Sequence, residues 1–427
     1  MLRSLGGIGR ILAANWAPLL AWFLAGQLVR ASVIIIAAPL GAESPLAALL
    51  LMPIAALARL VSYIGMFLVV RHSLPGYRAL AGPDVRFTSL RDTAGEFLRV
   101  LLVSIGPFFT LYALIGLLNE DLSAYAGLAF RYAGPFGDNS QVLDVGDGPI
   151  VVAVVVIAFV ARMVLKFFGP RLPGWTAIPG IYLEATWVFV ALTGISSAFG
   201  PVIEWIGNRQ VVHWWNDSRE FLVNLAAPIR FVIEGVDWIT PVALQLVLLP
   251  LAWLFIASII YLRALGNVVE DAVPVPRAIG ERLKAGASRV PKLLRQYGYL
   301  FTGTWDEVGR PAVFSGRLIL RSGLHSLGIF LVAYAVLFAL TQWINRWLYI
   351  AVGAHDIKFW LVANDVLSLV TSAVTEPLRV ALLAAAFGYC LERWAAGRMP
   401  RLDEPVATPG LGTTQTATPE APRSGTS

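Results

Sequence analysis

Long apolar runs alternate with short polar stretches over most of the chain. Runs of about 20 residues or more are long enough to cross a hydrocarbon core about 30 Å thick as a helix. Such runs lie at 14–39, 46–70, 97–118, 149–168, 176–200, 240–264, 318–342 and 366–391. The pattern predicts an all-α fold, a polytopic transmembrane bundle of about eight helices that occupies residues 1–398.

The composition supports a membrane protein. Hydrophobic residues make up 57% of the chain and charged residues only 14%, whereas a soluble domain carries about 25% charged residues. We therefore expect the lipid bilayer to be the main partner. The basic start of the chain resembles a signal peptide, but its apolar run continues past the small residues near Ala31. A retained first span is predicted.

Basic residues are concentrated in alternate connections between the runs. The loop 71–96 carries four arginines and the segment 263–317 carries nine basic residues, whereas the loop 40–45 carries none. The positive-inside rule then predicts that both termini are cytoplasmic. The net charge of +6 is explained by this topology, and no nucleic-acid partner is expected. Arginine greatly outnumbers lysine, which indicates a bacterial protein of the cytoplasmic (inner) membrane.

Three segments outside the runs have a distinct composition. The stretch 219–240, close to Trp214, is amphipathic and predicts a helix at the outer interface. The basic amphipathic segment 277–295 predicts binding to anionic lipids of the inner leaflet, and a solvated cytoplasmic helix is the alternative. The tail 399–427 is rich in Pro, Thr, Ser and Gly and is expected to be disordered.

The sequence contains no recognised catalytic arrangement. It has no H-E-x-x-H motif, no phosphate-binding G-x-x-x-x-G-K-[ST] loop and only one cysteine. Ser196 and His325 are the components of a serine protease dyad, but the predicted threading puts them about 20 Å apart in depth. We therefore expect a protein that is not an enzyme and needs no cofactor or metal.

Ionisable residues inside the apolar runs form the candidate site, because charge at the middle of a bilayer is costly and marks pathways or binding sites. They are Arg30, Arg59, Glu184, Glu376 and Arg379, together with the neutral Gln245. The rise of about 1.5 Å per residue places them at two levels. Arg30, Glu376 and Arg379 fall at the level nearer the outside.

These depths predict specific ion pairs. Glu376 is expected to pair with Arg30 or with Arg379 on its own helix, and Glu184 with Arg59. Pro377 removes a backbone hydrogen bond and bends the last span beside the pair. Such pairs hold helices together, which is the favoured role; the alternative, which the surplus of arginine over carboxylate supports, is that they face a water-filled path or an anionic lipid group.

Two functions fit these features. The first is a transporter or channel-like permease for an anionic or amphipathic solute held near the intramembrane charges. The alternative is a non-catalytic scaffold or assembly subunit of a cell-envelope complex, which contacts protein partners in the membrane through its amphipathic segments.

Overall fold

The computed structural model describes residues 6–77, 90–114, 116–133, 148–168, 176–210, 243–264 and 310–396, with short pieces between 213 and 237. In chain order its elements are α2 (Ile8–Glu43), α3 (Pro45–Val70), the 3-10 turn η1 (Arg71–Ser73), α5 (Leu90–Leu114), α6 (Leu117–Ala133), α7 (Gly148–Phe168), α8 (Ala177–Gly207), the π-helical turn η5 (Leu244–Leu248), α11 (Leu249–Ala264), α15 (Arg310–Arg321), α16 (Leu324–Val352) and α17 (Ile357–Ala396). All regular structure in these ranges is helical. The prediction of an all-α protein is confirmed.

Several of these helices are long and apolar enough to cross a membrane. In the described residues five candidate spans have the required length and hydropathy: Ile8–Gly41, Pro45–Ser73, Ala177–Gly194, Leu324–Val352 and Ile357–Trp394. Shorter apolar helices cover Val151–Leu165 and Leu246–Leu262. These spans indicate a multi-pass membrane protein, and the larger number of eight stays a prediction.

Two of the predicted spans are interrupted. The predicted span 97–118 is divided between α5 and α6 at Gly116, which has a φ of 84°. The predicted span 318–342 is divided between α15 and α16 at Gly323, which has a φ of 91°. Glycine adopts such angles without the steric cost of a Cβ atom. The chain therefore changes direction within both apolar stretches, and the bounds of these two spans stay a prediction.

Close packing joins α2 to α3, the two helices at the centre of the fold. A Cβ atom at Gly26 would lie 2.4 Å from the Cβ of Ser62, and one at Gly65 would lie 2.3 Å from a ring carbon of Trp22. The Ser62 hydroxyl also donates a hydrogen bond to the Trp22 carbonyl at 2.9 Å. Small residues at these contacts let the two backbones approach closely, as is common between membrane helices.

The first and last spans meet at one end of the molecule. Asn15 Nδ2 in α2 donates a hydrogen bond to Ser73 Oγ at 2.9 Å, just after α3. Gly76 lies against Glu392 near the end of α17. The start of α2, the end of α3 and the end of α17 therefore share one side, as the predicted topology requires. Their cytoplasmic location stays a prediction.

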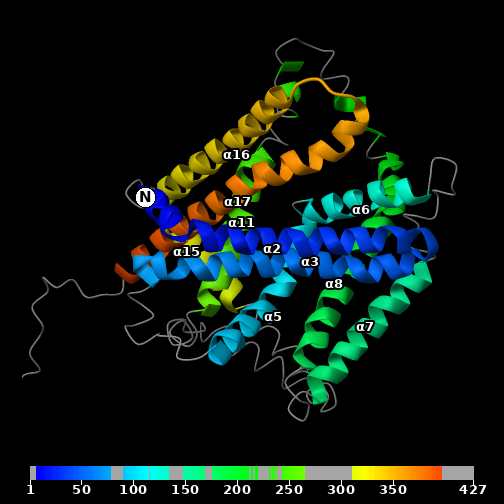
Figure 1. Ribbon diagram of the computed structural model, residues 1–427, viewed down its shortest axis with the longest axis horizontal. Helices are drawn as coiled ribbons and strands as arrows, with labels where there is room; N and C mark the ends of the chain where they lie inside the picture. The colour runs from blue at the N-terminus through cyan, green and yellow to red at the C-terminus, as the bar shows by residue number, and fades with distance from the viewer. Residues whose placement is uncertain are drawn as a thin grey trace, which may run out of the picture.

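Figure 1 shows how the other helices surround this centre. The blue α2 and α3 lie side by side along the middle of the view, and α6 lies along α2. The α16 and α17 helices form one hairpin on one side, and α7 and α8 form another on the opposite side. Segments 277–295 and 399–427, and most of 219–240, lie outside the described residues, so the predictions made for them stay predictions.

Candidate functional site

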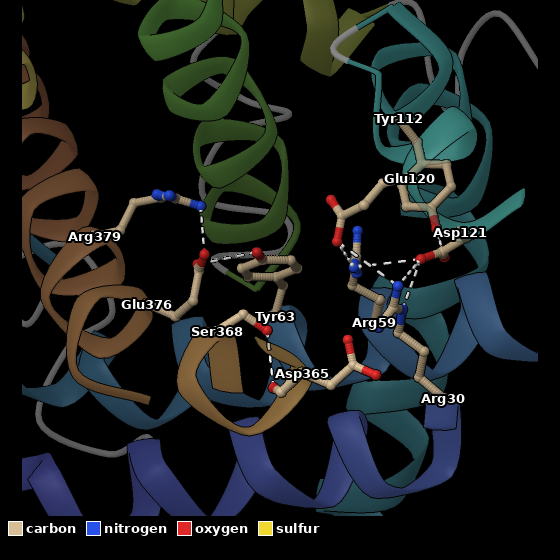
Figure 2. Close-up of polar contacts among 10 residues, drawn as sticks. All are labelled: Arg30, Arg59, Tyr63, Tyr112, Glu120, Asp121, Asp365, Ser368, Glu376 and Arg379. Carbon is tan, nitrogen blue, oxygen red and sulfur yellow. Dashed lines mark hydrogen bonds and ion pairs between the residues drawn. The ribbon is translucent and has the colours of Figure 1, made fainter. Parts of the chain in front are cut away.

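Four charged side chains from three helices meet beside the break between α5 and α6. We call Arg30 of α2, Arg59 of α3, and Glu120 and Asp121 of α6 the central cluster (Figure 2). Arg30 Nε donates a hydrogen bond to Asp121 Oδ1 at 2.6 Å. Arg59 Nη2 donates one to Glu120 Oε1 at 3.0 Å and lies 3.4 Å from Asp121 Oδ1. The Tyr112 hydroxyl of α5 also donates to Asp121.

The local sequence explains how the two carboxylates reach the arginines. Gly116 turns the chain after α5, and Glu120 and Asp121 follow near the start of α6. A helix N-terminus carries partial positive charge and favours carboxylates there. Arg59 is the middle residue of the 29-residue candidate span Pro45–Ser73. The break in the helix therefore brings acidic residues to the middle of a span.

The four groups differ in exposure. The side chains of Asp121, Arg59 and Arg30 are 1%, 8% and 15% exposed, whereas that of Glu120 is 57% exposed. Two arginines face two carboxylates, so the formal charges cancel. Charges removed from water need such pairing, because an isolated buried ion costs many kcal/mol.

A second ion pair lies on α17, and we call it the α17 pair. Arg379 Nη1 donates a hydrogen bond to Glu376 Oε1 at 2.6 Å, and the Tyr63 hydroxyl donates to Glu376 Oε2 at 3.0 Å. The Arg379 guanidinium carbon lies 5.8 Å from the ring centre of Trp253 in α11, close enough for a cation–π contact. Glu376 is near the middle of the candidate span Ile357–Trp394.

Helix α3 connects the two groups, because Tyr63 follows Arg59 by one helical turn. A small hollow of about 10 Å³, with room for about one water molecule, lies along α2 and α3 at this position. Its lining consists of Phe23, Gly26, Gln27, Arg30, Arg59, Ser62, Tyr63 and Met66. In the described part of the chain the buried Arg59 Nη1 atom has no hydrogen-bond partner.

The structure confirms one of the three predicted pairings and contradicts the other two. Of the two partners predicted for Glu376, Arg379 is the one that binds it. Arg30 is paired with Asp121 instead. Glu184 binds Arg162 of α7, so the predicted pair with Arg59 is wrong.

The partners predicted for Arg30 and Arg59 are wrong for a physical reason. Arg30 and Arg59 reach the same Asp121 carboxylate, so the prediction of two separate levels is wrong for them. The start of α6 supplies Glu120 and Asp121, which follow the end of the predicted span 97–118 and were therefore not placed among the intramembrane charges. Gln245 falls in η5, and its side chain lies outside the described residues.

Sequence reasoning missed Glu120, Asp121 and Tyr112 as members of the site. The acidic doublet follows an apolar run and was assigned to a solvated connection. The available signal was the surplus of intramembrane arginines, which required carboxylates from another part of the chain.

Comparison of this chain with protein-family models, with characterised proteins and with solved structures gives no match. The interpretation of the site rests on its own geometry.

Proposed function

We propose that this protein is a transporter or channel-like permease of the bacterial cytoplasmic membrane, with about eight spans, both termini inside, and an anionic or amphipathic solute as its cargo. One observation carries the proposal. The broken helix α5–α6 meets Arg30 and Arg59 in the interior of two candidate spans, beside a hollow that both arginines line.

A broken helix at membrane depth has a recognised use. Non-helical backbone inside a bilayer is tolerated where it is covered by protein or faces a cavity. Transporters bind solutes at such breaks, because helix termini and freed backbone groups supply polar contacts near the midplane. Intramembrane arginines and carboxylates mark the same kind of pathway.

The lining of the hollow favours an anionic or amphipathic solute. Arg30 and Arg59 supply guanidinium groups, and Arg59 Nη1 is an unused donor within the described residues. Guanidinium groups bind carboxylate and phosphate oxygens in pairs. Phe23 and Met66 add apolar surface to the same hollow, and an amphipathic solute reaches this surface when the hollow widens.

Purification from native membranes tests this function. Small molecules and lipids that remain bound to the full-length protein are identified by mass spectrometry. The test variant carries Arg59→Gln with Glu120→Gln, which removes one charge of each sign and leaves the Arg30 and Asp121 pair. The matched control carries Arg162→Gln with Glu184→Gln, which removes the ion pair between α7 and α8.

A transporter of this kind retains a small anion or amphiphile in the wild-type protein and in the control, and loses it in the test variant. The identified compound must then cross the membrane of liposomes that contain the protein. Equal retention by all three proteins, or no retained compound in any of them, contradicts the proposal.

A second candidate function is the scaffold of a membrane complex, and Asp365 favours it. This residue is exposed on the candidate span Ile357–Trp394, among the exposed Val362, Val366 and Leu369. A carboxylate facing lipid is unfavourable, so a polar partner fits this surface. A photo-crosslinking residue in place of Val366 tests the idea in native membranes: a protein adduct supports a scaffold, and adducts with lipid alone contradict it.

A further inference from the structure

The two carboxylates of the central cluster are neighbours in sequence but are held very differently. Asp121 is 1% exposed and is bound by Arg30 and Tyr112. Glu120 is 57% exposed; its Oε1 lies 3.0 Å from Arg59 Nη2 and 3.7 Å from Arg30 Nη2. Only Asp121 is enclosed by the helices around it.

This difference sets how easily each carboxylate leaves the arginines. Loss of the Glu120 contact leaves Arg59 with a second carboxylate, because Arg59 Nη2 also lies 3.4 Å from Asp121 Oδ1. Removing a buried partner costs about 3–5 kcal/mol, because the other charge is left uncompensated. Glu120 can swing away by changes in its side-chain rotamer, whereas Asp121 cannot leave without a large loss.

When Glu120 moves away, the central cluster loses one of its two carboxylates. Arg30 and Arg59 then face Asp121 alone, and the central cluster carries one excess positive charge. Such an excess in a poorly hydrated site favours the entry of one anion. Arg30 and Arg59 line the hollow, so an anion in the hollow reaches the same two guanidinium groups.

We infer that Glu120 occupies, in the empty protein, the position of the oxyanion group of the solute, and that the solute displaces it. This inference rests on the proposed function and names its chemistry: a singly charged oxyanion such as a carboxylate, which exchanges for the Glu120 carboxylate without changing the charge of the cluster. Figure 2 shows the Glu120 and Asp121 carboxylates both next to the two guanidinium groups.

The apolar lining adds a condition on the rest of the solute. Phe23 and Met66 line the water-sized hollow beside the guanidinium groups, so a hydrocarbon chain attached to the oxyanion gains contact with them only when the hollow widens. An amphiphile and a small free anion share the oxyanion chemistry. They differ in whether the chain adds affinity.

Binding of dodecanoate and of acetate distinguishes these cases. The full-length protein in a neutral maltoside detergent is titrated with each anion by calorimetry, as wild type and as Glu120→Gln. We expect Glu120→Gln to bind dodecanoate about tenfold more tightly, because the competing carboxylate is gone, an effect of about 1.4 kcal/mol. Glu120→Ala is a second variant with the same expected change.

The control variant is Glu184→Gln, which removes an intramembrane carboxylate from a different helix pair and changes the net charge equally. Its affinity for dodecanoate should equal that of the wild type. Tighter binding of dodecanoate alone identifies an amphiphile, and equal tightening for acetate identifies a free anion; both support the exchange.

Two results would overturn the inference, and they separate it from the function on which it rests. Equal dodecanoate binding by wild type, Glu120→Gln and Glu120→Ala contradicts the exchange but leaves an anion site. Absence of binding to all of them contradicts both the exchange and the proposed solute class.

Discussion

The central cluster and the α17 pair both hold arginine against carboxylate inside candidate spans, but they are assembled from different parts of the chain. The α17 pair forms between residues three apart on one helix, Glu376 and Arg379. The central cluster joins α2, α3 and α6, with Glu120 and Asp121 lying 61 or more residues from their arginine partners. A local pair stabilises one helix, whereas a long-range cluster depends on the packing of several.

The two regions also differ in how firmly their carboxylates are held. Glu376 is 12% exposed and accepts hydrogen bonds from Arg379 and Tyr63. Glu120 is 57% exposed and lies next to arginines that line the hollow. The central cluster therefore has both a fixed and a replaceable carboxylate. In the α17 pair the single carboxylate is held from two helices.

Removal of the fixed carboxylate should have the largest effect on stability. Asp121→Asn leaves Arg30 and Arg59 buried without their enclosed partner. We expect the free energy of unfolding in mixed SDS micelles to fall by about 3–5 kcal/mol. Glu120→Gln is the matched neighbour and should cost only about 1 kcal/mol, because Arg59 keeps Asp121 Oδ1 at 3.4 Å. Equal losses for the two variants would show that both carboxylates are structural.

A steric change between α2 and α3 should have the next largest effect. Gly26→Ala places a Cβ atom 2.4 Å from that of Ser62, one turn before Arg30, so the two helices must separate. Overpacking of this kind costs about 1–3 kcal/mol. Gly127→Ala on α6 is the control, since a Cβ there has open space. A loss in the control as large as in Gly26→Ala would exclude close packing as the cause.

Loss of charge in the α17 pair should have the smallest effect. Glu376→Gln still accepts the Tyr63 hydroxyl, and Arg379 keeps its contact with the Trp253 ring. We expect unfolding in the same micelles to become easier by about 1 kcal/mol, because Arg379, at 21% exposed, is less buried than Arg30 and Arg59 and keeps the amide oxygen as an acceptor. A loss equal to that of Asp121→Asn would show that the α17 pair stabilises the fold as much as the central cluster does.

The same comparison explains which features could be predicted from the sequence. The apolar runs predict the long helices, because about 20 such residues cross a bilayer only as a helix. The α17 pair was foreseeable, since residues three apart share a helix face. The break at Gly116 was not, because apolar residues continue on both sides of it; at Gly323 the preceding Arg321 and Ser322 are a turn signal that the apolar run did not take into account.

The partners of Arg30 and Arg59 depend on those breaks. Nothing local to either arginine identifies α6 as the source of carboxylates, and a depth measured along each predicted span could not place residues beyond a break. The only remaining indication was the number of arginines and carboxylates within the predicted spans. Intramembrane arginines outnumbered the carboxylates assigned to the spans, and Glu120 and Asp121 are the residues that restore the balance.

An experimental structure of the protein in lipid nanodiscs with dodecanoate is the most direct test of the central claim. We expect density for a carboxylate bound to Arg30 and Arg59, and Glu120 rotated away from both arginines. Asp121 should keep its contacts with Arg30 and Tyr112. Glu120 still bound to Arg59 at saturating dodecanoate, with no ligand in the hollow, would contradict it.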